Sequence, residues 1–307
     1  MYPKRGHVSR FPLHVDIETT AKCNLRCPMC ANRHLGSTDF NAYSHMDFSL
    51  FKKIVDQCSK NQLYSIRLSW RGEVLLHPQI TKILHYAKVE KRIKNVSFLT
   101  NGSLLKGSIA EALVDYGIDY VSVSVDGLDK MYEKIRYPLK FKTIYNNLLA
   151  FKELKRQKNK SRPAVRITTL WPAIANDPAE YSKRMKRVSD RIVFNPLKDY
   201  RITTQDKQFI CQFPWERLFV GFDGKVHACS NTIEPLIVGN VNSQDLQAIW
   251  HGPTMQRIRE LHGNLNRLEI PQCSRCSYGV NYQDRWKEHD WTNWDPNELI
   301  LPSKDNS

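Results

Sequence analysis

The sequence predicts an α/β protein: an open, TIM-like partial (β/α)6 barrel followed by a small cysteine-rich domain made of a β-hairpin and helices. Three observations predict this fold class. Strand-like apolar runs alternate with amphipathic helical runs between residues 13 and 195, which favours parallel strands joined by right-handed crossovers. Several of these strands end in polar or glycine-containing segments, where barrels of this class place their chemistry. Past residue 200 the alternation stops and cysteines recur.

The barrel elements are expected in strict alternation. The first strand is expected within Leu13–Glu18, directly before a loop with three cysteines. Asp47 is placed to cap a helix over Phe48–Ser59. Later strands are expected at Tyr64–Ser69, Asn95–Leu99, Tyr120–Val125, Ala164–Leu170 and Arg191–Phe194, and later helices at Gln79–Glu90, Ser108–Tyr116, Lys142–Gln157 and Pro178–Val188. Six repeats are fewer than the eight of a closed barrel, so the barrel is expected to stay open.

The chain past the barrel is expected to form a separate unit. We place the barrel at residues 1–200, the cysteine-rich domain at 201–280 and a C-terminal arm at 281–307. Phe222-Asp223-Gly224 predicts a tight turn that joins two short strands, Arg217–Val220 and Lys225–Ala228. Helices are expected at Ser243–Trp250 and Pro253–His262, and the arm carries Trp286, Trp291 and Trp294, which we expect to pack on the barrel.

Composition favours a soluble globular protein. Hydrophobic residues make up 41% of the 307 positions and charged residues 25%, and no apolar run approaches the ~18 residues of a membrane span. The N-terminus lacks the apolar core of a signal peptide, so we expect a cytoplasmic protein. The net charge of +15 leaves several partners open: an anionic substrate, an acidic protein, RNA, a membrane surface, or only solvent around charged helices. No aromatic-interleaved basic motif is present, so nucleic-acid binding is not expected.

Cysteines dominate the chemistry of this sequence. In a reducing compartment, eight cysteines indicate metal binding or catalysis before disulfides. Cys58 lies in the apolar stripe of a predicted helix and is expected to be a buried thiol without a role. The other seven fall into two groups: Cys23, Cys27 and Cys30, then Cys211, Cys229, Cys273 and Cys276.

The first group has the spacing C-x3-C-x2-C on a short loop after the first strand. Three thiolates can hold three irons of a [4Fe–4S] cluster, and they leave the fourth iron open to bind and activate a small molecule. The alternative is a structural zinc ion with His34 as the fourth ligand.

This loop, with its place after the first strand, resembles that of the radical S-adenosylmethionine (SAM) superfamily, and the resemblance covers about residues 13–195. It implies a site for SAM. Trp70-Arg71-Gly72-Glu73-Val74 is similar to the family's Gly-Gly-Glu-Pro motif, which holds the methionine amino group; Gly72 and Glu73 are kept, while Arg71 and Val74 depart from it. Further residues similar to the family's ribose and carboxylate contacts are Asn101, Ser124, Asp126 and Arg136. Met29 stands where the family usually has an aromatic residue.

The second group of cysteines resembles the short "twitch" form of the SPASM domain, in which a hairpin separates the first two cysteines and a helix precedes the last pair. Four cysteines imply one fully ligated auxiliary [4Fe–4S] cluster, and a four-cysteine zinc ribbon is the alternative. The layout is similar to that of the twitch-type dehydrogenases that oxidise deoxy-scyllo-inosamine, a cyclitol alcohol, to a ketone.

The resemblance implies an oxidoreductase that cleaves SAM reductively to a 5′-deoxyadenosyl radical, which then abstracts a hydrogen from a substrate carbon. We expect a small substrate, sugar- or cyclitol-like and anionic if phosphorylated, with the auxiliary cluster as electron acceptor and a flavodoxin or ferredoxin-type electron donor. Arg166 is the candidate catalytic base. One alternative is a peptide-modifying radical SAM enzyme, which the dozen residues ahead of the first strand disfavour. The other is a non-catalytic, zinc-binding, RNA-associated protein.

Overall fold

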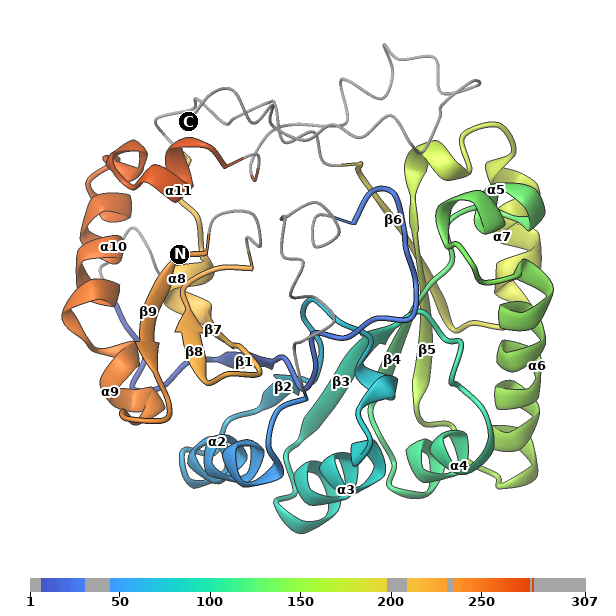
Figure 1. Ribbon diagram of the computed structural model, residues 1–307, viewed down its shortest axis with the longest axis horizontal. Helices are drawn as coiled ribbons and strands as arrows, with labels where there is room; N and C mark the ends of the chain where they lie inside the picture. The colour runs from blue at the N-terminus through green and yellow to red at the C-terminus, as the bar shows by residue number, and fades with distance from the viewer. Residues whose placement is uncertain (1–6, 31–44, 198–208, 231–234, 277, 279–307) are drawn as a thin grey trace.

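The computed structural model describes residues 7–30, 45–197, 209–230, 235–276 and 278. Within these residues the strands form one nine-stranded sheet in the order β6-β5-β4-β3-β2-β1-β7-β8-β9. The sheet curls into an open half-barrel, and α2, α3, α4 and α6 lie along its outer side (Figure 1). His34 and the C-terminal arm lie outside the described residues.

The barrel strands are mutually parallel, as predicted. They are β1 His14–Ile17, β2 Ser65–Arg67, β3 Asn95–Thr100, β4 Tyr120–Ser124, β5 Ala164–Leu170 and β6 Arg191–Asn195. The helices between them are α2 Phe48–Lys60, α3 Ile80–His85, α4 Gly107–Asp115, α5 Asp129–Ile135, α6 Phe141–Gln157 and α7 Pro178–Lys186. The predicted α/β class and open partial barrel are confirmed.

Two helical details differ from the prediction. The helix expected over Gln79–Glu90 is α3 followed by a π-helical turn, Tyr86–Glu90. Helix α5 was not predicted, because it is only seven residues long and buries just Tyr132 and Ile135. Two residues are too few to make a recognisable apolar stripe.

The local patterns explain the core. Strand β5 alternates, with Val165, Ile167 and Thr169 buried and their neighbours half-buried, as a strand with one covered face should. In α2 the apolar stripe Phe51, Ile54, Val55 and Cys58 is buried. Cys58 is therefore the predicted core thiol. The predicted cap also forms: the Asp47 side chain accepts a hydrogen bond from Ser49 N at 2.7 Å.

The sheet continues past the barrel. Strand β7, Arg217–Val220, pairs in parallel with β1, and β8, Lys225–His227, is antiparallel to β7. Strand β9, Ile237–Asn240, was not predicted and pairs with β8. The remaining elements are α8 Phe213–Glu216, α9 Leu246–Trp250, α10 Pro253–Gly263, a 3-10 helix at Arg267–Glu269 and α11 Pro271–Ser274. In the described residues no helix has the length and apolarity to cross a membrane.

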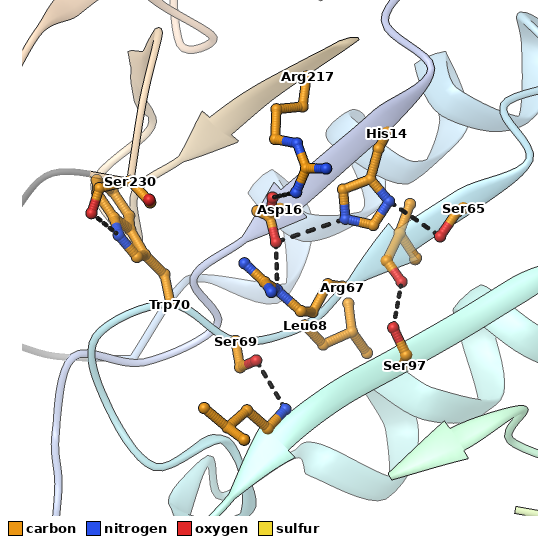
Figure 2. A network of polar contacts seen from close by, with 12 residues as sticks. His14, Asp16, Ser65, Arg67, Leu68, Ser69, Trp70, Ser97, Arg217 and Ser230 are labelled. Atoms are coloured by element: carbon orange, nitrogen blue, oxygen red, sulfur yellow. Dashed lines mark hydrogen bonds and ion pairs between the residues drawn. The ribbon is translucent and has the colours of Figure 1, made fainter. Parts of the chain in front are cut away.

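A polar network on the inner side of the sheet ties β7 to the barrel (Figure 2). Asp16 of β1 is fully buried and pairs with Arg67 of β2. Arg217 of β7 lies 3.8 Å from the same carboxylate and His14 lies 3.5 Å from it. One buried acid thus joins three neighbouring strands.

Candidate functional site

A cavity of about 730 Å³ lies at the C-terminal ends of the barrel strands, within the size range of small-molecule sites. Its wall contains the three cysteines of the first group together with every residue predicted to contact SAM. These are Cys23, Cys27, Cys30, Gly72, Glu73, Asn101, Ser124, Asp126 and Arg136. Residues far apart in the chain are therefore brought to one place.

Gly72 allows the motif loop to pack against the segment that leads into the cysteine loop. A Cβ atom on Gly72 would lie 2.3 Å from the Thr20 carbonyl oxygen and 2.7 Å from that of Lys22. Next to it, the Glu73 N–H donates to the Lys22 carbonyl at 2.7 Å. Only glycine fits this approach, which gives a physical reason for the glycine in the motif.

The cysteine loop is also held from its other side. Asn24 Nδ2 donates to Ser103 Oγ at 3.0 Å, and Asn101 Nδ2 donates to Asn24 Oδ1 at 2.8 Å. Arg26 N–H donates to the Tyr137 carbonyl at 2.8 Å. Asn101, predicted as a SAM contact, thus also anchors the cysteine loop, a task that the sequence did not suggest.

Glu73 is 3% exposed and its carboxylate is largely occupied. Oε1 accepts from Thr100 Oγ1 at 2.6 Å and from Leu75 N at 3.2 Å, and Oε2 accepts from Asn101 N at 2.6 Å. Burial raises the pKa of Glu73. A carboxylate has about four acceptor positions, so one remains for a donor in the cavity.

Asp126 and Arg136 form a pair beside the cysteine loop. Asp126 Oδ1 accepts from Leu170 N at 2.7 Å, and Arg136 Nε donates to Oδ2 at 2.6 Å. Arg136 Nη1 lies 3.8 Å from Cys27 Sγ. Ser124 is buried in the same wall. Arg136 therefore faces a cysteine sulfur as well as the cavity.

The first cysteine group fits a metal cluster. Cys23 is open to the cavity yet closely surrounded by protein, and this burial raises its pKa to about 12. Burial also raises the pKa of Cys27, and within the loop the thiolates repel one another. Such a group is stable as thiolates only around a positive metal centre. Among the described residues, no three Cys, His, Asp or Glu side chains converge tightly enough for a single metal ion.

The second cysteine group gathers at the far end of the sheet. Cys211 precedes α8, Cys229 follows β8, Cys273 lies in α11 and Cys276 follows it. Burial, together with the charges of neighbouring cysteines in the group, raises the pKa of Cys211 and that of Cys273 to about 12. Four mutually repelling thiolates are the donor set of a fully ligated cluster.

Two buried basic side chains surround Cys273. His262 Nε2 lies 3.6 Å from Cys273 Sγ, and Arg267 Nη1 donates to the Cys273 carbonyl at 2.8 Å. Burial lowers the pKa of His262 to about 4. The neighbouring Tyr278 N–H donates to Cys276 Sγ at 3.3 Å. The sequence analysis assigned none of these contacts.

The two motif residues before Gly72 bond to segments that follow β1 and β8. Arg71 Nε donates to Glu18 Oε1 at 2.7 Å, and its Nη2 bonds the other oxygen of the same buried carboxylate. Trp70 Nε1 donates to the Ser230 carbonyl at 3.2 Å (Figure 2). Both side chains line the cavity. The arginine that departs from the family motif, Arg71, is thus paired with the acid Glu18. Nothing in the sequence near either residue indicates this pairing.

The ends of β5 and β6 also contribute to the cavity, although the sequence analysis passed over them. Thr168, Thr169 and Asn195 follow the same strand-end rule as the predicted residues and line the wall. Arg166 lies deeper in β5, where Nε donates to Ser122 Oγ at 3.0 Å and the guanidinium stacks on Tyr120. Arg166 is not among the described residues that line this cavity.

Comparisons with known proteins agree with this geometry. A model of the radical SAM superfamily matches residues 17–170, and a model of the SPASM iron–sulfur cluster-binding domain matches residues 211–277. The Pyrococcus furiosus "tungsten-containing aldehyde ferredoxin oxidoreductase cofactor-modifying protein" is 34% identical over 113 residues, 36% of this chain and 30% of that protein. The chain covers only 25–34% of the length of the first three curated relatives.

Solved structures share the fold over most of the chain. BtrN, a deoxy-scyllo-inosamine dehydrogenase crystallised with AdoMet and 2-DOIA, has a TM-score of 0.62 at 19% identity, over 89% of this chain and 95% of that one. Streptococcus suis SuiB bound to the precursor peptide SuiA has a TM-score of 0.58 at 15% identity, over 86% of this chain and 72% of that one.

The matched regions coincide with the two cysteine groups. The first model describes a domain that binds SAM and a [4Fe–4S] cluster, and the second a domain that binds additional iron–sulfur clusters. The chain therefore belongs to the radical SAM superfamily and carries a SPASM domain after its barrel.

Proposed function

We propose that the protein oxidises an alcohol carbon of a small sugar- or cyclitol-like molecule, phosphorylated ones included, to a ketone or aldehyde. Loss of one hydrogen atom from carbon and one proton from oxygen leaves one electron to be removed. When bound, SAM and the two clusters supply the hydrogen abstraction and the acceptor for that electron. The cluster ligands in this proposal are Cys23, Cys27 and Cys30 at the cavity, and Cys211, Cys229, Cys273 and Cys276 at the auxiliary site.

The observation that carries the proposal is a hydrogen bond that links a cavity-lining side chain to the segment of the second cysteine group. Trp70 lines the cavity, and its indole N–H holds the carbonyl of Ser230, directly after Cys229. One side chain thus touches both the space for substrate and the segment of an auxiliary ligand. An electron acceptor next to the substrate is what a net two-electron oxidation requires.

The chain's own residues would orient the reactants. The remaining acceptor position of Glu73 suits the ammonium group of SAM, since that carboxylate is already held by three donors. Asn101, Ser124 and Asp126 complete the same wall. Arg136, which Asp126 holds in place, presents positive charge to Cys27 and to a SAM carboxylate.

The charges of the cavity also bear on the substrate. Arg26 brings positive charge to its wall, which suits an anionic substrate, whereas the charge of Arg71 is paired with Glu18. Arg166 is our candidate for accepting the hydroxyl proton: burial lowers the pKa of its guanidinium, and it lies two residues before Thr168 on the same face of β5.

We also propose a cytoplasmic protein that receives electrons from a flavodoxin or ferredoxin-type donor. In support, none of the eight cysteines, each within the described residues, is paired in a disulfide. Free thiols persist in reducing compartments, where reduced electron carriers are found.

The test uses anaerobically reconstituted protein with SAM, reduced flavodoxin and a panel of cyclitols and sugar phosphates, each deuterated at its carbinol carbons. We expect deuterium in the 5′-deoxyadenosine and a product that has lost two hydrogen atoms, detected by mass spectrometry. A product at the oxidation level of the substrate contradicts the proposal. A cross-linked or epimerised peptide in a parallel panel would instead assign a peptide-modifying activity.

A further inference from the structure

His262 makes a contact that the proposed reaction does not use. It lies in the last turn of α10 and is 2% exposed. Its Nε2 atom lies 3.6 Å from Cys273 Sγ. The ring meets Trp215 edge-on, with 6.2 Å between ring centres and 89° between planes. The imidazole is therefore held with one nitrogen against a cysteine sulfur.

The surroundings of His262 indicate which nitrogen carries hydrogen. Nδ1 is buried and has no hydrogen-bond partner among the described residues. A neutral imidazole has a single N–H, and a buried donor left without an acceptor costs about 1–3 kcal/mol. A hydrogen on Nε2 points at the sulfur, whereas a hydrogen on Nδ1 points at nothing. The Nε2–H tautomer is therefore the favoured one.

We propose that His262 is a positioning residue that raises the reduction potential of the auxiliary cluster by donating an N–H···S hydrogen bond to Cys273. The inference rests on the proposed function, in which the second cysteine group holds an electron-accepting cluster. Reduction adds one electron, and the negative charge spreads onto the ligand sulfurs. A donor aimed at a sulfur is bound more strongly by the reduced cluster, so it favours reduction.

Arg267 acts on the same ligand in the same direction. Its side chain is 1% exposed, and Nη1 donates to the Cys273 carbonyl at 2.8 Å. A buried cation near the cluster favours the more negative, reduced state. Cys273 thus meets a donor at its sulfur and a buried cation at its carbonyl, and a raised potential suits a cluster that must take an electron from substrate.

The experiment measures the potential of the auxiliary cluster alone. The full chain is prepared with Cys23, Cys27 and Cys30 changed to Ala, so that only the second cysteine group binds iron. In this background His262→Leu removes the N–H, and His262→Gln keeps one, because the glutamine amide nitrogen reaches the position of Nε2. His251→Leu is the matched control, because His251 is exposed and bonds the Arg10 carbonyl instead of a sulfur.

Each protein is titrated with dithionite and followed by electron paramagnetic resonance, with iron and zinc measured in parallel. A typical hydrogen bond of about 1 kcal/mol predicts a roughly fivefold fall in the reduction constant for His262→Leu, or about 40 mV for one electron. We expect His262→Gln to recover part of this shift, and His251→Leu to match the parent.

The outcomes separate this inference from the proposed function. An unchanged potential in His262→Leu at full iron content overturns the inference and leaves the proposed function standing. Zinc in place of iron in the parent overturns both. If the leucine variant binds less iron, His262→Asn replaces it, since the shorter amide cannot reach the sulfur. A potential for His262→Asn equal to that of His262→Gln then refutes the hydrogen bond, and a lower one supports it.

Discussion

Replacing Glu73 with glutamine changes one oxygen of a carboxylate that already accepts three hydrogen bonds into a donor at almost constant size. Either position of the new NH2 group meets a donor already in place. An NH2 group in place of Oε2 would face the Asn101 N–H, which lies 2.6 Å from Oε2 in the wild type. An NH2 group in place of Oε1 would face the Leu75 N–H, which lies 3.2 Å from Oε1. The substitution also removes the negative charge that we expect to hold the ammonium group of SAM.

The expected loss of SAM affinity follows from these contacts. A hydrogen bond to a charged group contributes about 1.5–3 kcal/mol, so the dissociation constant of SAM should rise roughly 10- to 150-fold. Calorimetry on anaerobically reconstituted protein measures it. Thr100→Val is the matched control, because it removes one hydrogen bond to Glu73 and keeps the charge. SAM affinity within about threefold of wild type, with full iron content, would refute the reasoning.

Four further predictions concern the same two centres and the sheet that carries them. Burial raises the pKa of Glu73, and the charged groups that face it are Arg136 and Cys23. The carboxylate therefore takes up its proton at a higher pH than an ordinary glutamate does. SAM affinity should therefore fall as the pH is lowered toward the raised pKa of Glu73, at a higher pH than for an ordinary glutamate, and the dependence should disappear in Glu73→Gln. Changing the three cysteines of the first group to Ala should remove roughly half the iron and all reductive cleavage of SAM, as seen by 5′-deoxyadenosine assay; residual cleavage would contradict this. Cys276→Ala should still form 5′-deoxyadenosine but no oxidised product, and an oxidised product in that variant argues against the auxiliary acceptor. Asp16→Asn should destabilise the fold by about 3 kcal/mol, the lower end for a broken buried pair, because Arg67 and Arg217 are 34% and 26% exposed; an unchanged denaturation midpoint would show that the network adds nothing.

The parts of the fold that were predictable depend on local signals. The alternation of β5 and the apolar stripe of α2 are visible in the sequence because each element has one covered face. The strand-end rule placed Glu73, Asn101 and Asp126 correctly in one wall, since parallel strands end on the same side of a sheet.

The parts that were missed depend on partners distant in the chain. Glu18 and Arg71 are 53 residues apart, and nothing near either residue indicates their pairing. His262 looked like the end of an ordinary helix, because its significance comes only from the sulfur across from it. Strand β9 is short and contains Gly239, so its composition did not mark it as a strand.

The parallel pairing of β7 with β1 has a consequence for engineering this protein. Four residues of β1 are in register with β7, from His14↔Arg217 to Ile17↔Val220. A chain truncated before β7 would leave β1 as an exposed edge strand with unpaired backbone groups, which invites self-association. The SPASM domain is therefore not a detachable module, and a functional chimera would have to exchange β1 and β7 together.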